Sequence, residues 1–140
     1  MNFGPQVVPD PTAMSRETLR ILRPAGTAGF TAWVRVGWLA SVQATFPAFK
    51  LPPQIAELWT KPDIISKDLT DVGFKDVVVT PLVFTTKIDV ASFVDGLSAT
   101  APFLKPAGAK QKYEIYLKER ADGEGLIEME WEALIVTAKK

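Results

Sequence analysis

The segment RPAGTAGFTAW, residues 23–33, is a turn followed at once by an apolar strand. Upstream of it, apolar residues recur at helical spacing, and Asp10 or Thr12 can cap a helix that runs to about residue 23. The proline and the glycine of the turn end that helix, and residues 27–34 predict a buried strand. A helix, a tight turn and a buried strand in this order predict an α/β fold.

The rest of the chain continues to alternate between helical and strand patterns. The expected elements begin with a short helix over 37–46, a second over 54–59 and a third over 63–71 that Gly73 ends. A strand over 74–80 follows, and it resumes after Pro81 and runs to 87. The last elements are helices over 89–103 and 109–121 and a strand over 125–138. A proline inside a strand suits the edge of a sheet, because proline has no N–H to donate. The last strand alternates Glu with apolar residues and then becomes fully apolar, which predicts burial at its end.

Composition narrows the classes of function. The 140 residues suit a single domain spanning 1–140, with 47% hydrophobic residues to pack it. Lys plus Arg equals Asp plus Glu, 16 each, so no net field attracts nucleic acid, and the near-zero charge favours self-association. The sequence has neither Cys nor His, which are common metal ligands, and no apolar run reaches the length of a membrane span. We expect a cytoplasmic protein without a bound metal.

Four motifs, taken together, resemble the second half of class I S-adenosylmethionine-dependent methyltransferases. They are VPDP at 8–11, LRILRPAG at 19–26, GFTAW at 29–33 and LTDVGFKDV at 69–77. The branch that they most resemble includes the ubiquinone- and menaquinone-biosynthesis enzymes and many fungal secondary-metabolite methyltransferases. Nearly the whole chain takes part in this resemblance.

The resemblance implies a truncated Rossmann-like methyltransferase fold. Residues 27–33 resemble the family's fifth strand, 63–87 its last helix and sixth strand, and 125–138 its antiparallel seventh strand. The family's sheet places the seventh strand between the fifth and the sixth, so we expect a small mixed sheet packed with helices. The chain departs from the family at Ala25, where a glycine is usual, and we therefore expect the positive φ of that turn at Gly26.

The family's first half, which carries the glycine-rich cofactor loop, has no counterpart in these residues. We therefore expect no cofactor-binding residues and no independent methyl transfer. S-adenosylmethionine would bind only if a partner supplied the missing half. A clipped gene product of a full enzyme is an alternative interpretation. The expected ligand is a hydrophobic small molecule of secondary metabolism, and polyketides, terpenes, quinones and alkaloids all fit.

Six aromatic residues are the candidate substrate contacts: Trp33, Trp38, Phe46, Phe49, Trp59 and Phe84. Most of them fall in or beside residues 35–62, which by resemblance form a lid over the acceptor-substrate pocket. Ordinary core packing explains the same residues, because aromatic side chains dominate hydrophobic cores. The sequence leaves both interpretations open.

Two carboxylates, Asp10 and Glu57, are the candidate catalytic residues. The resemblance places Asp10 near the acceptor, where a buried carboxylate could serve as a general base. A helix cap explains Asp10 without any catalytic role, and a solvated helix face explains Glu57. A cofactor-independent cyclase or isomerase is therefore an alternative function, and a non-catalytic partner subunit is another.

The predicted strand over 27–33 loses its neighbour on one side when the family's first half is absent. Residues 2–8 can cover part of that edge. An apolar strand is costly to leave unpaired. We therefore expect the exposed sheet edge to pair with a second copy, which would give a homodimer, or with another chain.

Overall fold

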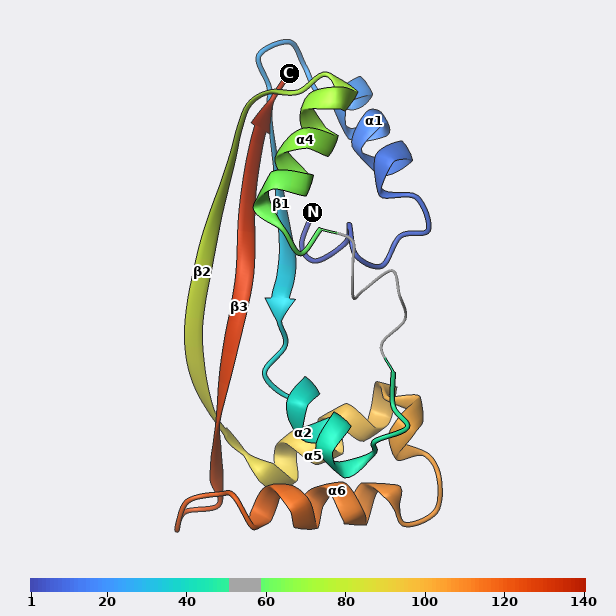
Figure 1. Ribbon diagram of the computed structural model, residues 1–140, viewed down its shortest axis with the longest axis vertical. Helices are drawn as coiled ribbons and strands as arrows, with labels where there is room; N and C mark the ends of the chain where they lie inside the picture. The colour runs from blue at the N-terminus through green and yellow to red at the C-terminus, as the bar shows by residue number, and fades with distance from the viewer. Residues whose placement is uncertain (51–58) are drawn as a thin grey trace. The chain divides into compact units, whose positions relative to one another are not determined.

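The computed structural model describes residues 1–50 and 59–140. These residues form two compact units, whose elements Figure 1 labels. The sheet unit contains residues 1–35, 59–83 and 132–140, and the helical unit contains residues 36–50 and 84–131. The expectation of a single domain over residues 1–140 stays a prediction.

The sheet unit combines a three-stranded sheet with two helices. Its elements are α1 (Pro11–Ile21), β1 (Thr27–Arg35), α4 (Pro62–Val72), β2 (Lys75–Asp89) and β3 (Leu126–Lys139), and the strands β2 and β3 also contribute residues to the helical unit. The strand order is β1-β3-β2, and β3 pairs antiparallel with β1, with Phe30 opposite Val136. This order confirms the expected placing of the seventh family strand between the fifth and the sixth. Pro81 lies, as expected, in an edge strand, β2.

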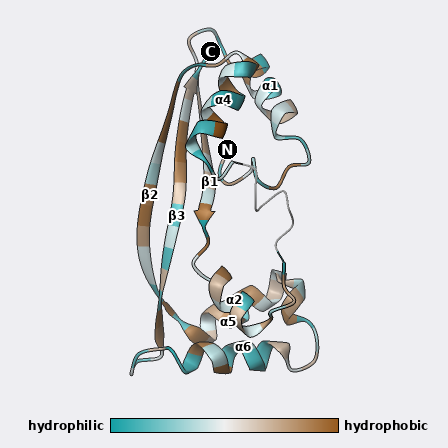
Figure 2. Cartoon of the chain, viewed as in Figure 1, coloured by the Kyte–Doolittle hydropathy of each residue, from teal (hydrophilic) through white to brown (hydrophobic). Residues whose placement is uncertain are grey.

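One face of this sheet forms the core of the sheet unit. Ala28, Phe30 and Ala32 of β1 are buried and alternate with more exposed residues, as a strand with one covered face requires. Both α1 and α4 pack on this face, and Ile65 and Leu69 of α4 are fully buried against it. Figure 2 shows the hydrophobic residues along the strands that supply this core. The alternating strand and the two amphipathic helices thus enclose a hydrophobic core between them.

The turn between α1 and β1 differs from the expectation. Its positive φ, 59°, lies at Ala25 and not at Gly26. Gly26 is needed for space instead, because a Cβ atom there would lie 2.8 Å from the Arg23 carbonyl oxygen. An alanine in the left-handed region costs about 1 kcal/mol, so this turn carries strain. At the end of α4, Gly73 has the expected left-handed conformation, with φ of 114°.

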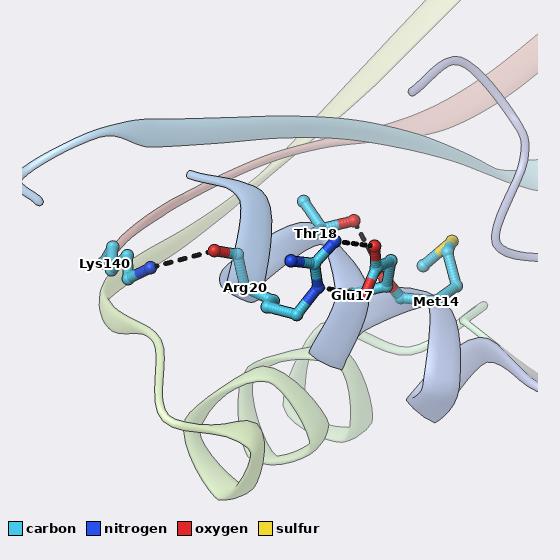
Figure 3. Close-up of polar contacts among 5 residues, drawn as sticks. All are labelled: Met14, Glu17, Thr18, Arg20 and Lys140. Atoms are coloured by element: carbon cyan, nitrogen blue, oxygen red, sulfur yellow. Dashed lines mark hydrogen bonds and ion pairs between the residues drawn. The ribbon is translucent and has the colours of Figure 1, made fainter. Parts of the chain in front are cut away.

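Side chains satisfy both ends of α1. The Asp10 carboxylate accepts a hydrogen bond from the Ala13 amide at 2.8 Å, which is the expected helix cap. At the other end, the Lys140 ammonium donates to the carbonyl oxygens of Arg20 at 3.2 Å and Leu22 at 2.8 Å. Figure 3 shows the contact between Lys140 and Arg20. A cation at the carbonyl end of a helix is favourable, so Lys140 holds the end of α1.

The outer edge of β1 is hydrogen-bonded to the first residues of the chain. The buried side-chain amide of Gln6 binds the main chain of Trp33 twice, accepting from its N–H at 2.6 Å and donating to its carbonyl oxygen at 2.8 Å. The Phe3 amide donates to Thr31 Oγ1 at 2.9 Å. A side-chain amide therefore takes the place of a neighbouring strand, and residues 2–8 cover part of the edge as expected. The homodimer through this edge stays a prediction.

The helical unit is built from short helices around a second core. Its elements are α2 (Leu39–Thr45), α5 (Val90–Thr100), the 3₁₀ helix η1 (Pro102–Leu104) and α6 (Ala109–Lys118). Its fully buried residues include Val42, Val90, Val94, Tyr113 and Leu117. The helix expected over 89–103 is two elements, because Pro102 disfavours a helical backbone at the residue before it. α6 ends before residue 121, where a tighter 3₁₀-type turn follows.

The helix expected over 54–59 lies outside the described residues except for Trp59. Among the helices that the structure describes, none is both long enough and apolar enough to cross a membrane.

Candidate functional site

Three of the predicted aromatic residues come together in the helical unit around Phe103. The Phe103 ring centroid lies 6.1 Å from that of Trp38, 6.1 Å from that of Phe46 and 4.9 Å from that of Phe49. All four side chains are half-buried, and they pack against the hydrophobic core of the helical unit. We call these four residues the aromatic wall.

The rings of the aromatic wall lie at the ends of α2, in the turn after it and in η1. Trp38 precedes the first turn of α2, and Phe46 follows its last turn. A further turn, in which the Phe49 amide donates to the Phe46 carbonyl oxygen at 2.8 Å, brings the next ring to the same cluster. Phe103 lies in η1, which exists because Pro102 ends the preceding helix and starts a tighter turn.

A buried pair of hydroxyl groups supports the wall. Tyr113 is fully buried, its ring centroid lies 6.2 Å from that of Phe46, and its hydroxyl lies 2.7 Å from Ser41 Oγ. Ser41 Oγ donates to the Trp38 carbonyl oxygen at 2.7 Å, which leaves the Tyr113 hydroxyl as the donor of the pair. Burial raises the pKa of Tyr113. The phenol therefore stays protonated near neutral pH and positions the wall, without acting as a base.

One cation lies beside the aromatic wall. The ammonium of Lys112 is 5.5 Å from the centroid of the Phe46 ring, within the range of a cation–π interaction. A positive charge beside an aromatic surface suits a ligand that joins an apolar ring to an oxygen acceptor.

The other three predicted aromatic residues lie outside the wall. Trp59 is 1% exposed in the sheet unit, with its ring at 5.4 Å from Phe30 in an edge-to-face arrangement, so it is a core residue. Trp33, also in the sheet unit, stacks on Phe3 with centroids 4.0 Å apart. Phe84 belongs to the helical unit and stacks on Trp131 at 6.3 Å. Trp59 is thus part of the hydrophobic core, and Trp33 and Phe84 each stack on a neighbouring aromatic ring.

The predicted catalytic carboxylates do not form an acid–base site in the described structure. Asp10 is exposed, and its carboxylate caps α1. Glu57 lies outside the described residues. Within residues 1–50 and 59–140, no group of three or more His, Cys, Asp or Glu could hold a metal ion. The catalytic roles of Asp10 and Glu57 stay predictions.

Phe103 is the residue of the wall that the sequence analysis did not single out. It was expected at the end of a long helix, where nothing connected it to residues 38–49. Pro102 was the available signal, because a proline at that point ends the helix and changes the direction in which the next side chain points.

Comparisons with known proteins agree with this fold. No protein-family model matches the chain. The methyltransferase tpcH of Aspergillus fumigatus is 24% identical over a 160-residue alignment that covers 99% of this chain and 57% of tpcH. The chain therefore spans a little over half the length of this relative.

Two solved structures are also similar. A putative methyltransferase from Bacillus halodurans matches with a TM-score of 0.56 and 12% identity, over 99% of this chain and 67% of that one. A phosphoethanolamine N-methyltransferase from Haemonchus contortus matches with a TM-score of 0.46 and 16% identity, over 99% and 32%. The strand order and the first of these matches show that the chain has a methyltransferase-like, Rossmann-like α/β fold.

Proposed function

We propose that this chain is part of a methyltransferase-like protein and binds a hydrophobic small metabolite on the aromatic wall. The observation that carries the proposal is the cluster of four half-buried rings around Phe103. Half-buried rings that pack on one another offer apolar contact area to a ligand. The similarity to the methyltransferase tpcH supports a role in methyl transfer.

The described residues do not fit the methyl donor, S-adenosylmethionine. A donor site on a Rossmann-like fold needs a glycine-rich loop whose backbone approaches the ligand closely. Gly37, which follows the end of β1, is used for packing, because a Cβ atom there would lie 2.9 Å from Met129 Cβ. Gly73 is the end of a helix. We therefore propose that the donor is held by a further polypeptide, and that this chain alone does not transfer a methyl group.

Ligand binding can be tested with menadione, a naphthoquinone, as the probe in equilibrium dialysis. We expect the wild-type chain to bind it and Phe103→Ala to bind it about tenfold more weakly, a loss of about 1.4 kcal/mol. Phe84→Ala is the matched control, since Phe84 is an aromatic residue of the same unit outside the wall. Circular dichroism checks that both variants are folded, and Phe49→Leu repeats the test with a milder change. Equal affinity in all variants would contradict the proposal.

Methyl transfer is tested separately. The lone chain is incubated with radiolabelled S-adenosylmethionine and menadiol, the reduced form of the probe, which offers hydroxyl groups as acceptors. We expect no labelled product. Labelled product formed by the lone chain would show that it holds the donor by itself.

A further inference from the structure

The segments that carry the aromatic wall contain positive charges but no negative ones. Residues 36–50 and 101–113 include the wall, α2, η1 and the start of α6, and they contain four lysines and neither Asp nor Glu. The other residues of the helical unit contain eight carboxylates against three Lys and Arg side chains. The helical unit therefore carries its positive charge on the segments of the wall and its negative charge on the remaining segments.

Three of the four lysines accompany rings of the wall. The ammonium of Lys112 lies 5.5 Å from the centroid of the Phe46 ring. Lys50 directly follows Phe49 in the chain, and Lys105 is the residue at which η1 ends. All three lysine residues are exposed. We call these three residues the wall lysines.

The carboxylates of the neighbouring helices pair with other cations. Asp95 of α5 forms an ion pair with Lys110 at 2.5 Å, and Glu114 of α6 forms one with Lys118 at 2.6 Å. In the part of the chain that the structure describes, none of the wall lysines forms an ion pair. Their charges are therefore not neutralised there, and together they attract an anion to the wall.

A neutral ligand would gain nothing from this arrangement. Like charges that lie near one another repel, so a group of cations without acidic partners is favourable only when an anion joins it. An ammonium has three N–H donors and no acceptor, so it binds an oxygen that carries negative charge. The rings supply the apolar contact, and the wall lysines select for charge.

We propose that the ligand of the aromatic wall is an aromatic acid. Its ring system packs on the wall, and its carboxylate, which is ionised near neutral pH, is held by the wall lysines. Lys112 is the principal contact, because its ammonium lies over a ring of the wall. The inference rests on the proposed function for the site and adds the charge of the ligand.

Two probes with the same ring and different charges test the inference. They are 2-naphthoate and its neutral methyl ester, and equilibrium dialysis at pH 7 measures the affinity of each for the wild-type chain. In 10 mM NaCl we expect the acid to bind about fivefold more tightly than the ester, as three exposed charges allow. In 1 M NaCl, where charges are screened beyond about 3 Å, the two affinities should become nearly equal.

Substitutions of lysine locate the charge that matters. Lys112→Gln should weaken binding of the acid about threefold and leave binding of the ester unchanged, whereas Lys112→Arg should keep the preference for the acid. Lys87→Gln is the matched control, because Lys87 is an exposed lysine of the same unit that lies on β2, outside the segments of the wall. A variant with glutamine at all three wall lysines should bind acid and ester equally.

The outcomes separate this inference from the proposed function. Equal binding of acid and ester by the wild-type chain, weakened for both by Phe103→Ala, would overturn the inference and support the proposed function. Binding of menadione without binding of 2-naphthoate would do the same. If none of the three probes bound, both would be overturned. A preference for the acid that persisted in the triple variant or in 1 M NaCl would also overturn the inference, because the wall lysines would not be its source.

Discussion

The sheet unit and the helical unit use aromatic side chains in different ways. In the sheet unit, Phe30, Trp59 and Phe74 are at most 2% exposed and form edge-to-face contacts inside the core. In the helical unit, all four rings of the aromatic wall are half-buried. The sheet unit instead leaves aliphatic strand residues accessible, such as Val78 at 55% and Ile135 at 42% exposed. The aromatic residues of the sheet-unit core therefore stabilise the fold, whereas those of the aromatic wall carry the proposed ligand contacts.

The largest effect on stability is expected in the hydrophobic core of the sheet unit. Phe30→Ala removes a ring that contacts both Trp59 and Phe74, and we expect it to lower the free energy of unfolding by about 3–5 kcal/mol. Ile135→Ala, on the face of the sheet opposite Phe30, should cost less than about 1.5 kcal/mol because that side chain is accessible. Urea denaturation measures both. Similar losses of unfolding free energy in the two variants would mean that both faces of the sheet are equally buried.

A smaller loss is expected at the edge of β1. Gln6→Leu leaves the N–H and the C=O of Trp33 without these two partners, and we expect a loss of about 2 kcal/mol. Gln43→Leu is the matched control, because Gln43 is an exposed residue of α2. The same urea series compares them. If Gln6→Leu proved as stable as the control, the side-chain amide would not be replacing a strand.

The two turns of the sheet unit should respond in opposite directions. Gly73→Ala places a Cβ atom at φ of 114° and 3.3 Å from Leu19 Cδ2, and we expect it to cost about 1 kcal/mol or more. Ala25→Gly relieves a left-handed alanine, and the gain, reduced by the greater freedom of glycine in the unfolded chain, should stay below about 1 kcal/mol. Melting temperatures give the sign of each change. A clear loss for Ala25→Gly would contradict the strain assigned to that turn.

The smallest effect is expected at a helix cap of the helical unit. Asp89 accepts a hydrogen bond from the Ser92 amide at 2.8 Å, and this bond holds the pKa of the carboxyl below its ordinary value. The folded state therefore binds this proton more weakly than the unfolded state, so the cap stabilises the protein above about pH 4 and the stabilisation is lost as pH falls below that value.

Asp89→Asn is the variant that isolates this carboxyl. It keeps an acceptor at the cap but removes the titrating group, so the fall in unfolding midpoint between pH 6 and pH 3 should be smaller than in the wild type. An equal fall would show that Asp89 does not contribute to the acid sensitivity.

The sheet unit followed from the sequence more completely than the helical unit did. Alternation in β1, the glycine at the end of α4 and the Asp10 cap are local signals, because each depends on neighbouring residues alone. The prediction that the positive φ of the turn lies at Gly26 was wrong, because it lies at Ala25. The space around Gly26 is limited by the Arg23 carbonyl oxygen, which a rule based on residue type alone does not consider.

The candidate site was less predictable. Trp38, Phe46 and Phe49 were grouped by their closeness in sequence, and the structure brings them together. Phe103 joins them from about fifty residues away, and only tertiary packing of η1 sets that contact. Trp59 was placed with them because it is close in sequence, yet its ring packs in the core of the sheet unit. Aromatic residues satisfy core and surface roles equally well, so their type alone does not assign them.

The central claim is that this chain supplies the strand order and the aromatic wall of a methyltransferase-like protein but not its donor site. Isothermal titration calorimetry of S-adenosylmethionine, with the lone chain and with a chimera in which this chain replaces the matched part of tpcH, tests it most directly. We predict no saturable heat for the lone chain and saturable binding for the chimera. A dissociation constant below roughly 100 μM for the lone chain, about −5.5 kcal/mol, would contradict the claim.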